Sequence, residues 1–238
     1  MKFIKIFLIF LLLNSTIVLA NPRISLEEKI GQMLIVGFRG LSVNNRSPII
    51  RDIKRYNLGG VILFDYDIVL KSHRRNIKST RQVKSLVNKL QSVAKTPLFV
   101  AIDQEGGKIR RLKKKHGFPN TLSAQVLGTK NNLNLTYKNA KIIASNLKKL
   151  GINFNFAPVV DLNINNSPVI GGLKRSFSSY PEVVTNHAST FIKAHSAYGI
   201  INAIKHFPGH GSSTTDSHYG ITDVTNTWQS VELEPYKN

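Results

Sequence analysis

The sequence predicts an α/β protein built around a parallel β-sheet. Apolar segments bounded by glycine or proline alternate with segments of helical spacing, and charged side chains directly follow several of the predicted strands. Strands and helices that alternate in this way form parallel sheets, which are either open or closed into a barrel. With 238 residues, of which 42% are hydrophobic, the chain can hold one domain, or part of one, with a sizeable core.

Each predicted element follows from a local signal. A capping box at 25–28 opens a short helix that runs into Ile30. Apolar residues at helical spacing predict the longer helices, and Gly151 and Gly199 end two of them. The expected helices after the first cover 49–56, 82–94, 135–150 and 181–198, and the expected strands cover 33–38, 61–64, 98–102, 152–160 and 200–204.

The first twenty residues predict an export signal. Lys2 and Lys5 precede an unbroken apolar run of eight residues, 6–13, and 18–20 places small residues where a signal peptidase reads. This run is far shorter than the ~20 apolar residues of a membrane-spanning helix, so an uncleaved anchor is the weaker alternative. We expect residues 1–20 to be removed and the mature chain to be periplasmic or secreted, without stable membrane insertion.

Lysine and arginine outnumber aspartate and glutamate by 33 to 13, which gives a formal net charge of +20. Such a charge is compatible with binding to nucleic acid or another polyanion. The basic residues are scattered, however, and the one dense stretch, 108–115, lacks the interleaved aromatic residues that stack on bases. We therefore favour a solvated basic surface and expect no nucleic-acid partner.

The chain has no cysteine, which excludes disulfides, thiol nucleophiles and cysteine zinc sites.

Charged residues stand just after four predicted strands, as Asp65, Asp103, Asp161 and the pair Lys205-His206. Open parallel sheets and parallel barrels both place their chemistry at this carboxyl edge. No Gly-x-Gly-x-x-Gly follows the first predicted strand, and no Gly-x-x-x-x-Gly-Lys-Ser/Thr occurs in the sequence. Dinucleotide and nucleoside triphosphate binding therefore lose their usual sequence support.

The segment 205–218 carries three histidines and one aspartate within fourteen residues, and its proline and glycines predict a loop. Asp216 and His218 are two residues apart. This spacing lets the carboxylate accept from one ring nitrogen and leaves the other to exchange a proton, as a general acid/base pair does. Two alternatives stand beside this hypothesis. His206, His210, His218 and Asp216 could bind a divalent metal, or the loop could be a rigid turn without chemistry.

A second candidate site follows the strand at 98–102. Asp103 ends this strand, so its carboxylate faces the same edge, and the glycines at 106–107 let a ligand approach the backbone closely. A carboxylate in this place can accept from two vicinal hydroxyls of a sugar. The alternative is that Asp103 caps the following turn. Arg175, in a glycine-rich loop, could clamp a hydroxyl or a carboxylate, or be an ordinary surface arginine.

Five segments of the chain resemble glycoside hydrolase family 3. They are Leu-Glu-Glu-Lys-Ile-Gly-Gln-Met-Leu-Ile-Val-Gly-Phe at 26–38, Asp-Gln-Glu-Gly-Gly at 103–107, Gly-Ile-Asn-Phe-Asn-Phe-Ala-Pro-Val-Val-Asp at 151–161, Arg-Ser-Phe at 175–177 and the histidine-rich segment at 205–218. The last is the most specific and is similar to the β-N-acetylglucosaminidase (β-hexosaminidase) branch rather than the β-glucosidase branch. The segments occur in the family's order over essentially all of the expected mature domain, residues 21–238.

The resemblance implies a TIM (β/α)8-type barrel that removes terminal β-linked N-acetylglucosamine, from peptidoglycan-type or related glycans, with retention of configuration. In this resemblance His218 matches the general acid/base and Asp216 its partner. The positions that hold the sugar match Asp103, Arg111, Arg175, Lys205 and His206. The resemblance also implies neither a cofactor nor a metal for this step, which weakens the metal-binding alternative.

The chain departs from the family pattern in one respect. The family's carboxylate nucleophile, an Asp in a Ser-Asp-Asp-like motif after the seventh strand, has no match here. Five strand–helix units of about 42 residues are predicted, and three more need about 125 further residues to close an eight-stranded barrel. We therefore expect a barrel truncated after about five units, inactive or nearly so and poorly stable. The alternatives are a catalytically dead glycan-binding remnant and, less favoured, a metal-dependent hydrolase.

Overall fold

The computed structural model describes residues 24–165 and 167–238. The export signal expected at 1–20 lies outside the described residues, so cleavage and export stay predictions. Within the described ranges, no helix combines the length and the apolar character needed to cross a membrane.

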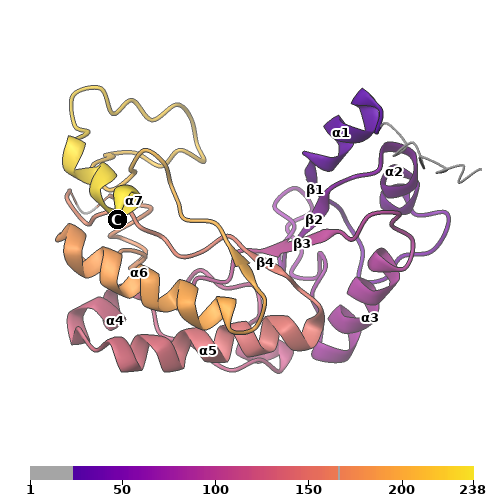
Figure 1. The fold of residues 1–238 in the computed structure, drawn as a ribbon, viewed down its shortest axis with the longest axis horizontal. Helices are drawn as coiled ribbons and strands as arrows, with labels where there is room; N and C mark the ends of the chain where they lie inside the picture. Colours follow the sequence, from indigo (N-terminus) through magenta and orange to yellow (C-terminus); the bar gives the residue numbers. More distant parts are fainter. Residues whose placement is uncertain (1–23, 166) are drawn as a thin grey trace, which may run out of the picture.

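A five-stranded parallel sheet forms the centre of the chain, and this confirms the predicted α/β class (Figure 1). In register, Val36 lies opposite Val61, which lies opposite Val100, while Ile102 lies opposite Asn155. The strands are β1 (Ile35–Gly37), β2 (Gly60–Leu63), β3 (Phe99–Ile102), β4 (Phe154–Asn155) and β5 (Ile201–Asn202).

The strands stand in the order of the sequence, β1-β2-β3-β4-β5, and each is hydrogen-bonded to its sequence neighbour. A doubly wound sheet reverses its strand order at a switch point, and this sheet does not. Barrels are wound in this sequential way. The described sheet is open, so its closure into an eight-stranded barrel stays a prediction.

The long helices are α2 (Pro48–Tyr56), α3 (Thr80–Gln91), α5 (Leu133–Leu150) and α6 (Pro181–Ser196).

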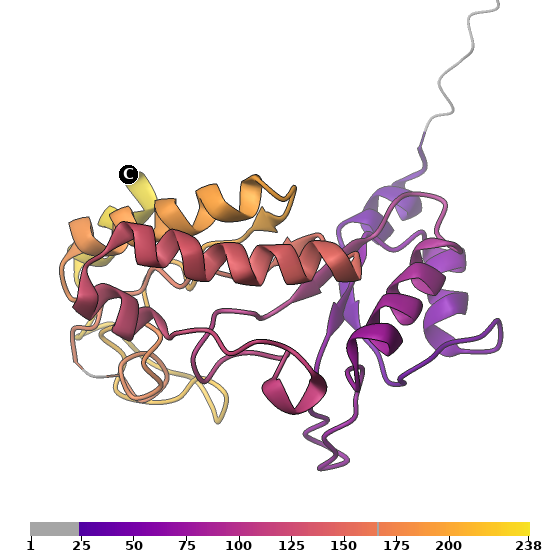
Figure 2. The same cartoon turned by 90° about the horizontal axis from the view of Figure 1, so that it is seen from below.

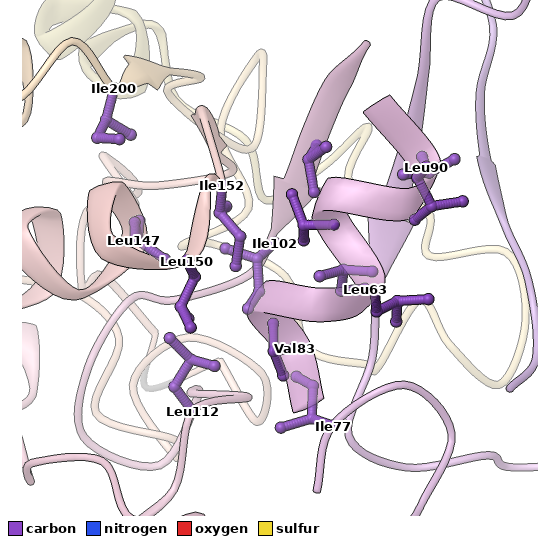
Figure 3. Packing of buried hydrophobic residues seen from close by; sticks show 14 of the residues in the cluster. Leu63, Ile77, Val83, Leu90, Ile102, Leu112, Leu147, Leu150, Ile152 and Ile200 are labelled. Carbon is purple, nitrogen blue, oxygen red and sulfur yellow. The ribbon is translucent and has the colours of Figure 1, made fainter. Parts of the chain in front are cut away.

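One face of the sheet packs against these helices. Side chains alternate between the two faces of a strand, and Val61, Leu63, Val100 and Ile102 all share the helix-covered face and are buried. Figure 3 shows Leu63 and Ile102 among Val83 and Leu90 of α3 and Leu147 and Leu150 of α5. Helices α5 and α6 lie side by side along their length in both ribbon views (Figures 1 and 2). Burial of each such aliphatic side chain contributes about 1.5–3 kcal/mol.

The other face of the sheet carries aromatic side chains that no helix covers. Phe99 and Phe154 lie with ring centroids 5.6 Å apart, and Phe154 and Phe156 with centroids 4.9 Å apart, both edge to face. Phe99 is 39% exposed and Ile201 is 48% exposed. An apolar face of this kind is the face that a closed barrel buries in its interior.

The capping and stop signals in the sequence act as predicted. In α1 (Leu26–Gln32), the Ser25 hydroxyl accepts from the Glu28 amide at 3.1 Å, and the Glu28 carboxylate accepts from the Ser25 amide at 3.3 Å. Helix α5 ends at Gly151, whose φ of 78° lies in the left-handed region that glycine adopts without strain. Pro181 opens α6, where its missing amide hydrogen leaves no helical bond unmade.

The predicted strand bounds were too long. The strand predicted at 152–160 forms only β4, because Ala157 turns back to donate to Asn155 and Pro158 has no amide hydrogen for the ladder. Beyond it, Val159 pairs with Lys205 only as an isolated bridge. The strands predicted at 33–38 and 200–204 are also shorter in the structure, as β1 and β5. Sequence periodicity did not find the short helices α4 (Ala124–Lys130), η1 (Lys114–His116), η2 (Ser230–Leu233) and α7 (Glu234–Lys237).

Truncation of Leu147 tests the packing between α5 and the sheet. Leu147 is fully buried, so Leu147→Ala is expected to lower the free energy of unfolding by about 2–5 kcal/mol. Ile142 lies on the same helix but is 41% exposed, so Ile142→Ala is expected to cost less than about 1 kcal/mol. Urea unfolding followed by circular dichroism measures both. Equal losses in the two variants would contradict the assigned core.

Candidate functional site

The carboxyl ends of β3 and β5 and the loop before α6 meet at a cavity of about 270 Å³. Parallel strands bring their carboxyl ends to one edge, which is why residues far apart in sequence gather here. The cavity is lined by every predicted site residue except Asp216, namely Asp103, Arg111, Arg175, Lys205, His206 and His218.

A chain of ion pairs lies in this cavity. The Lys205 ammonium is 2.9 Å from the Asp103 carboxylate and 2.8 Å from the Glu105 carboxylate, and its side chain is only 16% exposed. Arg111 donates to the other oxygen of Asp103 at 3.2 Å. Arg175 donates to both oxygens of Glu105, at 2.7 and 2.9 Å, in the bidentate geometry that a guanidinium favours. Charges that are buried together in this way fix one another's positions.

Both carboxylates are held in the ionised form. Burial raises the pKa of the Asp103 carboxyl, but the Lys205 and Arg111 cations outweigh burial, so that this pKa lies below its usual range. The pKa of the Glu105 carboxyl is lowered in the same way by Arg175 and Lys205 against the effect of burial. The site therefore presents fixed charges as strong hydrogen-bonding groups, which suit the hydroxyls of a sugar.

Asp161 organises the loop that follows β5. It is fully buried, and one of its oxygens accepts from the backbone amides of His206 at 3.1 Å and His210 at 2.9 Å. Its other oxygen lies 2.5 Å from Nδ1 of His206. Nε2 of His206 then faces Nη2 of Arg175 at 3.1 Å, which fits the tautomer with hydrogen on Nδ1. Asp161 thus sets both the path of the loop and the orientation of the His206 ring.

The structure brings Asp216 and His218 together as predicted. Nδ1 of His218 lies 2.7 Å from the Asp216 carboxylate, which also accepts from the His218 amide at 2.9 Å. This amide and the His218 ring lower the pKa of the Asp216 carboxyl. The His218 side chain is 74% exposed and lines the cavity, so its Nε2 is accessible for proton transfer. The geometry fits an acid/base pair, and the roles of both residues stay predictions.

His210 connects the Asp161-anchored loop to the acid/base pair. Its Nδ1 lies 2.5 Å from the Ser213 hydroxyl, and its Nε2 lies 3.1 Å from the hydroxyl of Ser217, which stands between Asp216 and His218. The imidazole therefore spans the base of the loop that carries the pair.

Sequence reasoning missed the parts played by Glu105, Asp161 and His210. Glu105 was visible as a second acid two residues after Asp103, but its partner Arg175 is 70 residues away and no local signal links them. Asp161 was noted at a strand end without a role. Asp65, noted in the same way, lies outside the cavity and pairs with Lys113 at 2.6 Å. Across 24–165 and 167–238, no group of three or more histidine, aspartate or glutamate side chains is placed to hold a metal ion.

The geometry defines an ion-paired cavity at the carboxyl edge of a parallel α/β sheet, and comparison with known proteins assigns the family. The Glycosyl hydrolase family 3 N terminal domain model matches residues 25–238, so the chain belongs to this family. Beta-hexosaminidase A of Pseudoalteromonas piscicida is 37% identical over 227 residues, which cover 86% of this chain and 36% of that protein. Beta-hexosaminidase of Tolumonas auensis is 36% identical over 193 residues, covering 79% of this chain and 54% of that one.

Solved structures give the same family. A glycoside hydrolase family 3 beta-N-acetylglucosaminidase from Paenibacillus sp. FPU-7 superposes with a TM-score of 0.78 at 33% identity, covering 90% of this chain and 39% of that chain. Native NagZ from Neisseria gonorrhoeae superposes with a TM-score of 0.74 at 27% identity, covering 86% and 58%. The chain thus spans between 36% and 58% of the length of these four relatives.

The lowered pKa of the buried Glu105 carboxyl predicts how the free energy of unfolding depends on pH. Because the folded-state pKa of Glu105 lies below its usual value of 4.5, the ionised form contributes stability that is complete above this value and is lost as the pH falls through the lower folded-state pKa. At neutral pH, Glu105→Gln is expected to cost about 3 kcal/mol or more, because Lys205 and Arg175 lose a buried partner. The difference between wild type and variant should shrink as the pH falls below 4.5.

Urea unfolding at a series of pH values measures this difference. Glu182→Gln is the control, because Glu182 is exposed at the start of α6 and forms no ion pair with another described residue. A cost of Glu105→Gln that stays constant from neutral to acidic pH would show that the ion pairs do not stabilise the fold.

Loss of the His210 side chain is expected to loosen the loop at 213–218 while the sheet stays intact. His210→Ala removes both imidazole contacts, so amides of this loop should exchange with solvent about tenfold faster. Hydrogen exchange measured by mass spectrometry reads the loop and the sheet separately. His116→Ala, in helix η1 and outside the residues that line the cavity, is the histidine control. Unchanged exchange at 213–218 would mean that His210 does not tether the loop.

Proposed function

We propose that this chain is the first part of the catalytic domain of an exported β-N-acetylhexosaminidase, which removes terminal β-linked N-acetylglucosamine from peptidoglycan-type or related glycans. One observation carries the proposal: the ion-paired Asp103 and Lys205 face the same cavity as His218, which Asp216 orients. The names of the relatives support the activity. One of them, NagZ from Neisseria gonorrhoeae, has been solved in complex with N-trifluoroacetyl-D-glucosamine, which supports an N-acylated glucosamine as the ligand.

The sugar is held by the fixed charges of the cavity. Asp103 accepts from vicinal hydroxyls, while Lys205, Arg111 and Arg175 donate to sugar oxygens; His206 completes the set beside Arg175. Because these groups already hold one another in place, the binding of a sugar needs little further ordering of side chains. This pre-organisation favours one orientation of the ring relative to His218.

His218 acts as the general acid and then as the general base. Its Nε2 gives a proton to the glycosidic oxygen as the bond to the leaving group breaks, and Asp216 stabilises the ring while it is charged. In the second step Nε2 takes a proton from the water that releases the sugar. The exposed loop position of His218 lets the ring approach the bond after the sugar has bound.

The carboxylate nucleophile of a retaining reaction comes from outside this cavity in our proposal. Of the described residues that line it, the carboxylates are Asp103 and Glu105, and both are ion-paired. A carboxylate that is already paired with lysine and arginine is a poor nucleophile. We propose that further strand–helix units close the barrel and carry the nucleophile. The sequential strand order, the uncovered aromatic face and the partial coverage of the relatives support this.

Binding of N-acetylglucosamine tests the sugar site. Titration of the chain with N-acetylglucosamine, followed by nuclear magnetic resonance, is expected to show saturable binding that Asp103→Ala weakens at least about tenfold, because Asp103 both accepts from the sugar and holds Lys205. Asp223→Ala is the matched control, since Asp223 is an exposed aspartate outside the cavity. Equal affinity in Asp103→Ala and wild type would overturn the proposed site.

Turnover distinguishes an inactive chain, an active glycosidase and a metal-dependent hydrolase. The chain alone is expected to hydrolyse a chromogenic N-acetyl-β-glucosaminide far more slowly than a full-length relative, because no unpaired carboxylate of its cavity can form the glycosyl-enzyme. A rate within about tenfold of such a relative would contradict this. Activity that disappears with a chelator and returns with zinc would favour the metal-dependent alternative instead.

A further inference from the structure

A second cavity lies on the opposite side of the loop that borders the sugar site. This loop turns back at Gly106, whose amide donates to the Ile109 carbonyl at 3.1 Å. Ile109 and Arg111 line the sugar cavity, whereas their neighbours Lys108 and Arg110 line a separate cavity of about 410 Å³. The turn between the bridged residues Gly106 and Ile109 therefore divides one stretch of sequence between two cavities.

The same division occurs in the loop after β4. Leu173 and Arg175 line the sugar cavity, and Lys174 between them lines the second cavity. The second cavity is thus bounded by two loops whose other faces form the sugar site.

The lining of this second cavity is strongly cationic. It contains Lys108, Arg110, Lys113 and Lys174, and no carboxylate among the described residues. Asp65 neutralises Lys113 at 2.6 Å. Lys108, Arg110 and Lys174 form no ion pair with any other residue in the described part of the chain. Three cations around a cavity without a counter-charge attract an anion.

A residue with a buried, unpartnered hydroxyl also lines this cavity. Thr121 lines the cavity and is 7% exposed, and its Oγ1 has no hydrogen-bond partner among the described residues. The Nε of Arg110 is also buried without a partner among the described residues, while its Nη1 donates to the Gly107 carbonyl. Buried polar groups without partners cost free energy, so native structures keep few of them without a reason. An acceptor-rich ligand in the cavity would satisfy such donors.

The basic stretch 108–115 therefore has two parts. Lys114 and Lys115 stand on the exposed helix η1 and line neither cavity, as expected for a solvated basic surface. Lys108, which is exposed, and Arg110, which is half-buried, line the second cavity instead. A volume of about 410 Å³ falls within the usual range of small-molecule pockets.

We propose that this second cavity, lined by Lys108, Arg110, Thr121 and Lys174, binds the phosphate or carboxylate group of a small anionic ligand. Lysine and arginine supply the charge-assisted donors that these groups prefer, and Thr121 adds a neutral donor at the buried end. The site is separate from the sugar cavity, and the proposal does not rest on the glycosidase function.

Isothermal titration of the full chain with inorganic pyrophosphate and with citrate, at low ionic strength, tests the proposal. Lys108→Ala/Lys174→Ala is expected to weaken binding about tenfold, because two charge-assisted contacts are lost. Lys114→Ala/Lys115→Ala is the matched control, because it removes the same charge from the same stretch of sequence. It should change the affinity less than about twofold.

The two probes distinguish the ligand chemistry. Tighter binding of pyrophosphate assigns a phosphate site and tighter binding of citrate a carboxylate site, and both support the proposal. Thr121→Val, which keeps the side-chain shape, is expected to weaken binding without lowering the unfolding temperature, since the hydroxyl has no partner to lose. No binding by the wild type, or an equal loss in the two double variants, would overturn the proposal. Asp103→Ala should leave pyrophosphate binding intact, so a failure of the sugar site is recognised separately.

Discussion

The contact of Lys205 with Asp103 and Glu105 is the interaction on which the site depends. It joins the end of β3 to the end of β5 across the intervening strand, so three strands must keep their register for the charges to meet. Asn155 supports this from β4: its buried amide exchanges two hydrogen bonds with the Gln104 backbone, at 3.0 and 3.1 Å, between the two acids. A buried charge without its partner is strongly destabilising, so the fold and the site constrain each other.

The two halves of the site have opposite physical characters. The ion-paired half, proposed to hold the sugar, is buried, with the Arg175 side chain only 9% exposed. The half proposed to supply the acid/base is an exposed loop, in which the His218 side chain is 74% exposed. A retaining glycosidase needs both, since the sugar must be held in one place while the proton donor moves to the leaving group and then serves water. The link between the halves is short: Asp161 fixes His206 and His210, and the His210 ring reaches the loop.

Local signals in the sequence were sufficient for the longer helices and for the α/β class, because caps, glycine stops and apolar spacing act within a few residues. They failed for strand length, since the end of β4 depends on a turn at Ala157 that periodicity does not register. The contact between Asp216 and His218 was predictable from their spacing of two residues. The pairing of Glu105 with Arg175, across 70 residues, was not, because it exists only once the strands have come together.

The net charge of the chain illustrates why position decides function where composition cannot. In the first cavity, carboxylates form ion pairs with Lys205, Arg175 and Arg111. The second cavity is lined by Lys108 and Lys174 and by no described acidic residue. Most other cations face solvent, which explains why a charge of +20 need not indicate a nucleic-acid partner. The same pairing limits the chemistry. Because each carboxylate that lines the first cavity already balances a cation, the retaining reaction proposed above needs a third carboxylate from outside the cavity.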